Sequence, residues 1–234
     1  MLVRLGLHTI VQPAFNYVPL DAREEDPEGC EEFESATPAD LVVFTSPRAV
    51  VHGLAQLPRD VLLRTRIAAI GPATASALSA AGLRVDVASP GGYTSEALLE
   101  TLAVESGRAT QPRRHAFVLA APDGRQALAE GLARQGWNVR TLMVYRARPA
   151  ELDRAALARL EEATGVLAVW TSGNAMNALS QRLPPAAWFR ICQGEWLVIS
   201  ERLRRLARAY GPPEIHLAGG PGNAAIVATI RGLL

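Results

Sequence analysis

The sequence contains no lysine, and all 24 of its basic residues are arginine. This absence excludes Schiff-base catalysis, pyridoxal-phosphate attachment and a lysine-containing phosphate loop. The motifs G-x-S-x-G, G-x-G-x-x-G and C-x-x-C are also absent, and the four histidines follow no metal-ligand spacing. We therefore expect no cofactor and no metal, so that any chemistry must come from hydroxyls, backbone amides, arginines and tyrosines.

An excess of one charge is also lacking. The 24 basic and 23 acidic residues leave a net charge of +1, which predicts no attraction to nucleic acid or to an anionic membrane surface. The longest apolar runs, such as Leu41–Phe44, are strand-sized and too short to span a membrane. With two cysteines and no recognisable secretion signal, we expect a cytoplasmic protein. No large apolar stripe indicates an oligomer, so we expect a monomer.

Short apolar runs alternate with segments of 3.6-residue periodicity, a pattern typical of βαβ units and a parallel sheet. The runs predict strands at 41–44, 67–70, 85–88, 116–121 and 139–144. Tyr145–Pro149 is then polar and ends in proline, as expected of a boundary between lobes. Beyond it the alternation begins again, with a helix predicted over 152–160 and a strand over 166–170.

The second half of the chain repeats the first. Phe44–Val50 aligns with Trp170–Met176, because each joins an aromatic residue to Thr-Ser and then to a helical segment. Downstream, Gly71 aligns with Ser200, and each lies 11 positions before a glycine. Two Thr-Ser turns in register with matching glycines indicate an internal duplication.

The turns after the predicted strands are rich in hydroxyl and glycine residues. At the carboxyl end of a parallel sheet, such turns expose the unpaired N–H groups of helix N-termini, which favour anions. The candidate anion-binding turns are Thr45-Ser46, Gly71-Pro72, Tyr93-Thr94-Ser95, Thr171-Ser172-Gly173, Ser200-Glu201-Arg202 and Gly220–Asn223. Each turn taken alone is equally explained by helix capping, and Ser46 is a full N-cap for the helix that begins at Pro47. Binding is indicated only by their number.

The ordered set of these segments resembles the uroporphyrinogen-III synthase family. The segments that carry the resemblance are Val42–Val50, Ile67–Gly82, Tyr93–Leu99, Val144–Arg146, Trp170–Asn174 and Val198–Arg202. In the last of these, Ser-Glu-Arg stands where the first half has Gly-Pro-Ala-Thr, as in bacterial members. The similarity extends from about Leu5 to the C-terminus.

The resemblance implies an α/β fold of two flavodoxin-like lobes with parallel sheets, joined by a two-stranded linker. One lobe would be discontinuous, formed by residues 1–18 and 150–234, and residues 19–149 would form the inserted lobe, with linkers near 16–20 and 142–150. It further implies a cofactor-free hydro-lyase of tetrapyrrole synthesis. The substrate would be hydroxymethylbilane, a linear tetrapyrrole with eight carboxylates. The family closes this chain into a ring with loss of water and inverts the last pyrrole.

The family tyrosine at the linker matches Tyr145, whose phenol would donate a hydrogen bond to the departing hydroxyl. The resemblance also assigns substrate binding to the residues of the repeated turns. These are Thr45, Ser46, Pro47, Arg48, Gly71, Thr74, Tyr93, Thr94, Ser95, Thr171, Ser172, Gly173, Asn174, Ser200, Glu201 and Arg202.

One departure from the family pattern concerns the first residues. The family begins with a strand, a Thr-Arg-Pro turn and a helix, whereas Met1–Gly6 resembles the end of that helix and His8–Phe15 the second strand. The first strand is central in such a sheet, so we expect a gap in the discontinuous lobe and weak stability. Two alternatives therefore stand beside the synthase: a two-lobed anion-binding protein without chemistry, and an inactive truncated homologue.

Overall fold

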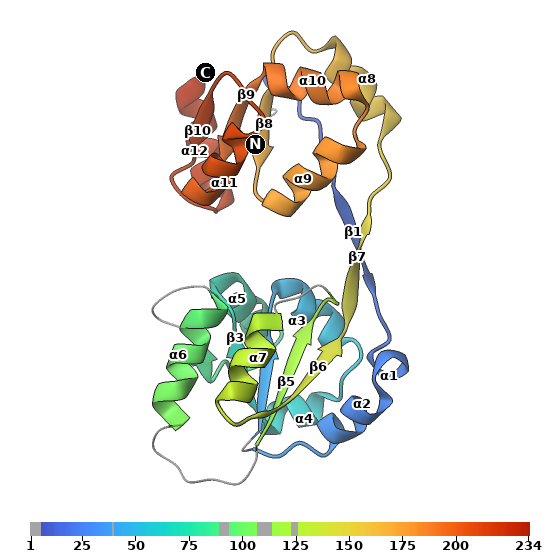
Figure 1. The fold of residues 1–234 in the computed structure, drawn as a ribbon, viewed down its shortest axis with the longest axis vertical. Coiled ribbons are helices and arrows are strands. Elements are labelled where there is room, and N and C mark those ends of the chain that lie inside the picture. Colours follow the sequence, from blue (N-terminus) through green and yellow to red (C-terminus); the bar gives the residue numbers. More distant parts are fainter. Residues whose placement is uncertain (1–5, 39, 89–93, 107–113, 123–125) are drawn as a thin grey trace. The chain divides into compact units, whose positions relative to one another are not determined.

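The computed structural model describes residues 6–38, 40–88, 94–106, 114–122 and 126–234. The chain divides into two compact units (Figure 1). Unit 2 is the continuous segment Tyr17–Ala147, and unit 1 combines Met1–Asn16 with Arg148–Leu234. The predicted two-lobed α/β fold with parallel sheets is confirmed.

Unit 2 contains a five-stranded sheet in which every described pairing is parallel. Its order is β4 (Val87–Ala88), β3 (Arg66–Ala69), β2 (Leu41–Phe44), β5 (His115–Ala120) and β6 (Asn138–Met143). The direction of winding reverses between β2 and β5, which makes the carboxyl ends of these two strands the topological switch point. The predicted strands agree with the observed ones to within two residues at each end.

Helices cover both faces of this sheet (Figure 1), because successive strand residues alternate between the faces. Val42 and Phe44 pack on one side with α1 to α5, whereas Leu41 and Val43 pack on the other with α6 and α7. The helices are α1 (Ala22–Glu25), α2 (Pro27–Glu34), α3 (Pro47–Leu54), α4 (Arg59–Arg64), α5 (Pro72–Ala80), α6 (Ser95–Ser106) and α7 (Gln126–Arg134).

Unit 1 contains a three-stranded parallel sheet of β10 (Ile215–Leu217), β9 (Glu195–Val198) and β8 (Leu167–Trp170). Its main core includes Trp170 and Trp196, whose ring centroids lie 5.2 Å apart. The helices are α8 (Arg154–Glu162), α9 (Gly173–Arg182), α10 (Pro185–Gln193), α11 (Glu201–Arg208) and α12 (Asn223–Leu233).

The duplication predicted from the sequence is confirmed by the turns that end two equivalent helices. Gly82 follows α5 with φ of 73°, and Gly211 follows α11 with φ of 71°. Both adopt the left-handed backbone that favours glycine after a helix. The two aligned glycines therefore have the same structural function in the two units.

The linker consists of two paired strands, β1 (Phe15–Pro19) and β7 (Tyr145–Pro149). The prediction of a strand over His8–Phe15 was wrong, because residues 7–13 form no strand and β1 begins only at Phe15. Strand geometry requires a partner, and β7 supplies one only to the later segment. Pro13 lacks the N–H that a ladder needs.

A cavity of about 820 Å³ separates β8 from Gly6–Gln12 in unit 1. Among the described residues β8 pairs with β9 alone, whereas β2, its counterpart in the repeat, pairs with both β3 and β5. Val169 on β8 is 39% exposed as a result. The gap predicted in the discontinuous lobe is therefore present in the described part of the chain.

Candidate functional site

Three of the predicted anion turns lie along one edge of the unit 2 sheet. Thr45-Ser46 follows β2, Gly71 follows β3, and Thr94-Ser95 lies between β4 and α6. The three strands are adjacent and parallel, so their carboxyl ends lie on the same edge. Tyr93 lies outside the described residues.

Thr45 joins β2 to β5 at the switch point. Its hydroxyl donates to the carbonyl of Leu119 at 2.8 Å, and its backbone N–H points to the same carbonyl at 3.4 Å. The donor of this side chain is therefore used within the fold. Its oxygen lone pairs are acceptors and would not attract a carboxylate.

Ser46 caps α3 as the sequence predicts, and it also contacts Tyr145. Its Oγ accepts from the N–H of Ala49 at 3.1 Å and lies 3.0 Å from the Tyr145 hydroxyl. A serine hydroxyl has one donor and two acceptor positions, so both hydrogen bonds can form together. The fold thus joins two predicted site residues that are 99 positions apart.

Tyr145 is 8% exposed and its ring contacts two other aromatic side chains. His52 of α3 stacks on it, with centroids 5.4 Å apart and planes inclined by 21°. Tyr17 of β1 meets it edge-on, with a centroid separation of 6.0 Å. The guanidinium of Arg48 lies 3.7 Å from the centroid of the Tyr17 ring. Sequence reasoning missed Tyr17 and His52. His52 follows Arg48 by four positions and so lies on the same helix face.

The other predicted residues of unit 2 differ in accessibility. Gly71 has φ of 82° and is the N-cap of α5, so a side chain there would strain the backbone. Thr74 is 1% exposed, and its hydroxyl donates to the Ile70 carbonyl at 2.9 Å. Ser95 is also buried, whereas Thr94 is exposed and caps α6 by accepting from Ala97. The buried hydroxyls of Thr74 and Ser95 do not reach the surface in this structure.

In unit 1 the repeated turns again lie on one sheet edge. Thr171–Asn174 follows β8 and Ser200–Arg202 follows β9. Ser172 and Ser200 are the N-caps of α9 and α11. A Cβ at Gly173 would lie 3.0 Å from a methyl group of Leu206, so this glycine permits close packing of α9 on α11.

Comparison with known proteins identifies the family. A family model described as uroporphyrinogen-III synthase HemD matches residues 1–228. The chain belongs to this family. A uroporphyrinogen-III synthase of Salmonella typhimurium is 30% identical over 226 residues, which covers 93% of this chain and 89% of the relative. One from Escherichia coli is 25% identical over 234 residues, with 96% and 93% covered.

Solved structures of the same family share the fold. A mutant uroporphyrinogen III synthase from Thermus thermophilus aligns with a TM-score of 0.60 at 21% identity, covering 99% of this chain and 91% of that one. The enzyme from Helicobacter pylori aligns with a TM-score of 0.61 at 18% identity, covering 94% and 90%. The two-lobed architecture is therefore that of the uroporphyrinogen-III synthase family.

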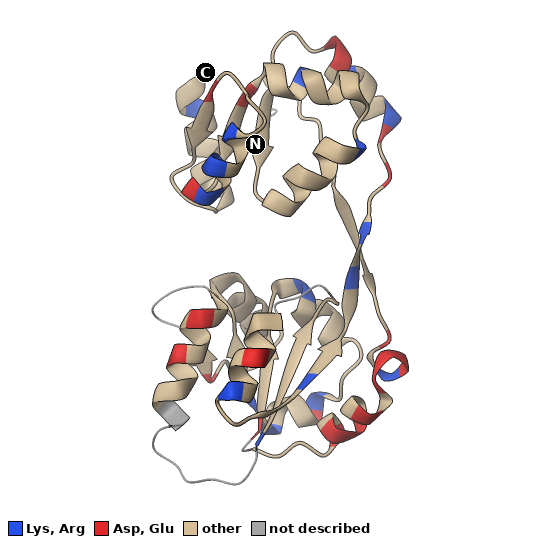
Figure 2. Ribbon diagram, viewed as in Figure 1, with Lys and Arg blue, Asp and Glu red and all other residues tan. Residues whose placement is uncertain are grey.

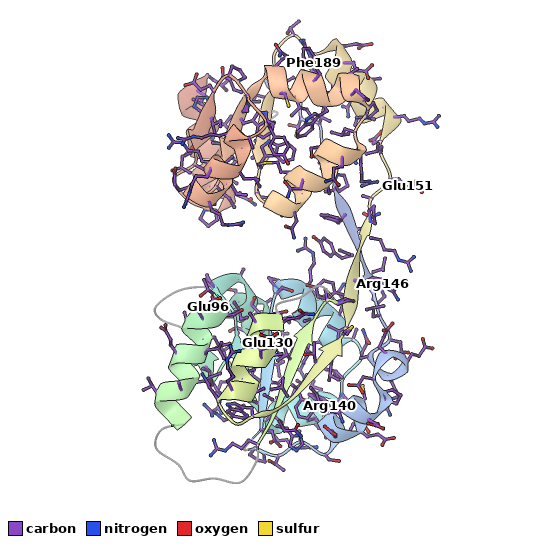
Figure 3. The ribbon with its side chains drawn as sticks, viewed as in Figure 1. Glu96, Glu130, Arg140, Arg146, Glu151 and Phe189 are labelled. Carbon is purple, nitrogen blue, oxygen red and sulfur yellow. The ribbon has the colours of Figure 1, made fainter. Side chains whose placement is uncertain are left out.

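Charged groups of unit 2 gather away from the turns, with acidic residues concentrated on α1 and α2 (Figure 2). Arg140 of β6 (Figure 3) donates two hydrogen bonds to Glu32 of α2, at 2.9 and 2.6 Å. This hydrogen bonding lowers the pKa of Glu32 and raises the pKa of Arg140. The pair joins a helix to a strand and is structural. Burial raises the pKa of the Cys30 and Cys192 thiols, which opposes a thiolate nucleophile.

One group of possible metal ligands occurs among the described residues. Oxygen or nitrogen atoms of Glu195, Glu214 and His216 all lie within 4.8 Å of one another. They lie at the amino ends of β9 and β10, the opposite edge of the sheet from the turns. The contact of 2.7 Å between His216 and Glu195 is accounted for by their mutual hydrogen bond. No described helix is both long and apolar enough to cross a membrane.

Proposed function

We propose that this chain converts hydroxymethylbilane to uroporphyrinogen III with loss of water, and so acts as a hydro-lyase of haem biosynthesis. The observation that carries the proposal is the family match over residues 1–228. The named relatives and the fold agree with it. The chemistry also suits the residues, because ring closure through a pyrrole-stabilised cation needs only a weak acid and a shaped site.

We assign the weak acid to Tyr145. Ser46 uses an acceptor position for the N–H of Ala49, so its own proton is available to the Tyr145 oxygen at 3.0 Å. In that arrangement the phenol proton points away from Ser46, and the bond from Ser46 favours its transfer. The phenol would donate to the hydroxymethyl oxygen as the carbon–oxygen bond breaks, and the oxygen would leave as water. The proton lost by the pyrrole carbon that forms the new bond restores the balance.

The substrate carboxylates would bind at the first turns of the helices that follow the strands. In unit 2 these are α3 and α5, which begin with Pro47 and Pro72 and have unpaired N–H groups near their N-termini. In unit 1 they are α9 and α11. Exposed Arg48 and Arg202 are available for charge-assisted hydrogen bonds. Thr74 and Ser95 are left out of this assignment because both are buried.

The activity is tested by supplying freshly prepared hydroxymethylbilane, oxidising the products and separating the type I and type III porphyrin isomers. The type III isomer should exceed that of a protein-free blank. Only the type I isomer, at the rate of the blank, would refute the proposal. Gel filtration of the same preparation tests the further proposal that the protein is a monomer.

The role of Tyr145 is tested by Tyr145→Phe. This change removes the donor and keeps the ring, so kcat should fall by up to about 100-fold. Stability should change by only about 1 kcal/mol, the value of one hydrogen bond. Tyr210→Phe is the matched control, since it removes a hydroxyl that donates to Asn177 at 2.7 Å in unit 1. Equal kcat values for the two variants would remove Tyr145 from the mechanism.

A further inference from the structure

Tyr17 and His52 form an aromatic bracket around Tyr145. His52 comes from α3, Tyr17 from β1 and Tyr145 from β7, so three elements distant in sequence supply the three rings. His52 is half-buried and Tyr17 is 37% exposed, and neither belongs to the hydrophobic core that includes Tyr145. Packing of the core therefore does not account for either ring.

The stacked His52 ring limits the motion of the phenol. A tyrosine ring at the first position of a strand keeps freedom about its side-chain torsions unless neighbours restrict it. Contact with His52 on the ring face and Tyr17 at the ring edge leaves the Ser46-bonded orientation favoured. The bracket thus sets the direction in which the phenol proton can be donated.

The Tyr17 ring holds a second group, the guanidinium of Arg48, which lies 3.7 Å from the ring centroid. A cation–π contact uses the face of the guanidinium and leaves its N–H donors in the plane free to bind an anion. An exposed arginine otherwise loses side-chain entropy when it binds a carboxylate. Because the ring restrains Arg48 beforehand, less entropy remains to be lost.

We propose that His52 and Tyr17 are positioning residues, His52 for the phenol of Tyr145 and Tyr17 for the guanidinium of Arg48. This inference rests on the proposed function, since it supposes that the phenol donates to substrate and that the guanidinium binds one of its carboxylates. The two effects differ kinetically. A misdirected phenol lowers kcat, whereas an unrestrained Arg48 weakens binding and raises KM.

Two pairs of variants separate ring contacts from other effects. His52→Ala should lower kcat about 2- to 10-fold with little change in KM, and His52→Phe, which keeps a ring, should restore kcat. Tyr17→Leu should raise KM about 2- to 5-fold with little change in kcat, and Tyr17→Phe should restore it. Val51→Ala is the control, because Val51 is the neighbour of His52 on α3 and is 65% exposed.

A spectroscopic readout keeps this test separate from the activity. In protein labelled at the tyrosine ring carbon that bears the hydroxyl, NMR of the free enzyme shows the Tyr145 signal, identified by its loss in Tyr145→Phe. His52→Ala should shift and broaden that signal, and Val51→Ala should not. If wild-type protein forms no type III isomer, the proposed function fails while this signal still reports on positioning. An unchanged signal in His52→Ala, or kcat unaffected in both alanine variants, would overturn the inference.

Discussion

Phe33 offers a test of whether the two units are stabilised by separate cores. Its side chain, on α2, is fully buried and meets the ring of Phe117 edge-on, with centroids 5.2 Å apart. Both rings belong to a core cluster whose members all lie within unit 2. Phe33→Ala removes the larger part of this contact and leaves a cavity beneath the sheet.

The expected loss is large. Phe-to-Ala changes in cores cost about 3–5 kcal/mol, because the transfer energy of the ring is lost and the site relaxes only partly. A single domain has a total stability of about 5–15 kcal/mol. The change should therefore remove a large share of the stability of unit 2 while leaving the buried contacts of unit 1 in place.

Hydrogen exchange followed by mass spectrometry measures this locally. In Phe33→Ala, amides of β2 and β5 should exchange with a protection free energy lower by about 3–5 kcal/mol, and amides of β9 should keep wild-type protection. Met176→Ala, at a fully buried position in the main core of unit 1, is the reciprocal variant and should affect β9 but not β2. Phe33→Leu, which removes less volume, serves if the alanine variant does not fold. Equal loss of protection in β2 and β9 in either alanine variant would refute separate cores.

Two further outcomes are expected. The pKa of Glu32 lies below its ordinary value of 4.5 in the folded protein because of Arg140, so their pair stabilises unit 2 above that value. The benefit disappears as the pH falls through the lowered pKa, so urea unfolding of wild type and Glu32→Gln should differ at neutral pH and converge in acid. Gly194→Ala places a Cβ 2.3 Å from the Val166 carbonyl oxygen and should lower the melting temperature of unit 1, unlike Gly165→Ala, whose Cβ meets nothing within 4 Å. Equal melting temperatures for the two glycine variants would contradict the packing argument.

Local sequence was sufficient for the elements whose signals lie within a few residues. The strands of unit 2 were predicted because continuous apolar runs suit strands buried on both faces. The caps at Ser46 and Ser172 followed from the hydroxyl before each helix. Helices α1 and α2 were not predicted, since the acidic, polar segment 22–34 has only short apolar spacing and its helicity depends on packing Phe33 against the sheet.

The arrangement of the candidate site depended on tertiary structure. Tyr145 and the Thr-Ser turn were predicted separately from the family pattern, but nothing in the sequence placed the Tyr145 hydroxyl 3.0 Å from Ser46. Tyr17 and His52 carry no local signal, because a tyrosine in a linker and a histidine in a helix are ordinary at such positions. They became candidates only when β1, β7 and α3 were brought together.

By itself, the sequence determined the duplicated α/β pattern, the turns with potential for anion binding and the family, because these depend on the order and spacing of residues along the chain. Only the tertiary structure decided which hydroxyls are used within the fold, which rings surround Tyr145 and where β8 lacks a second partner. These properties depend on contacts between segments up to 99 positions apart, and no periodicity or motif encodes such contacts locally.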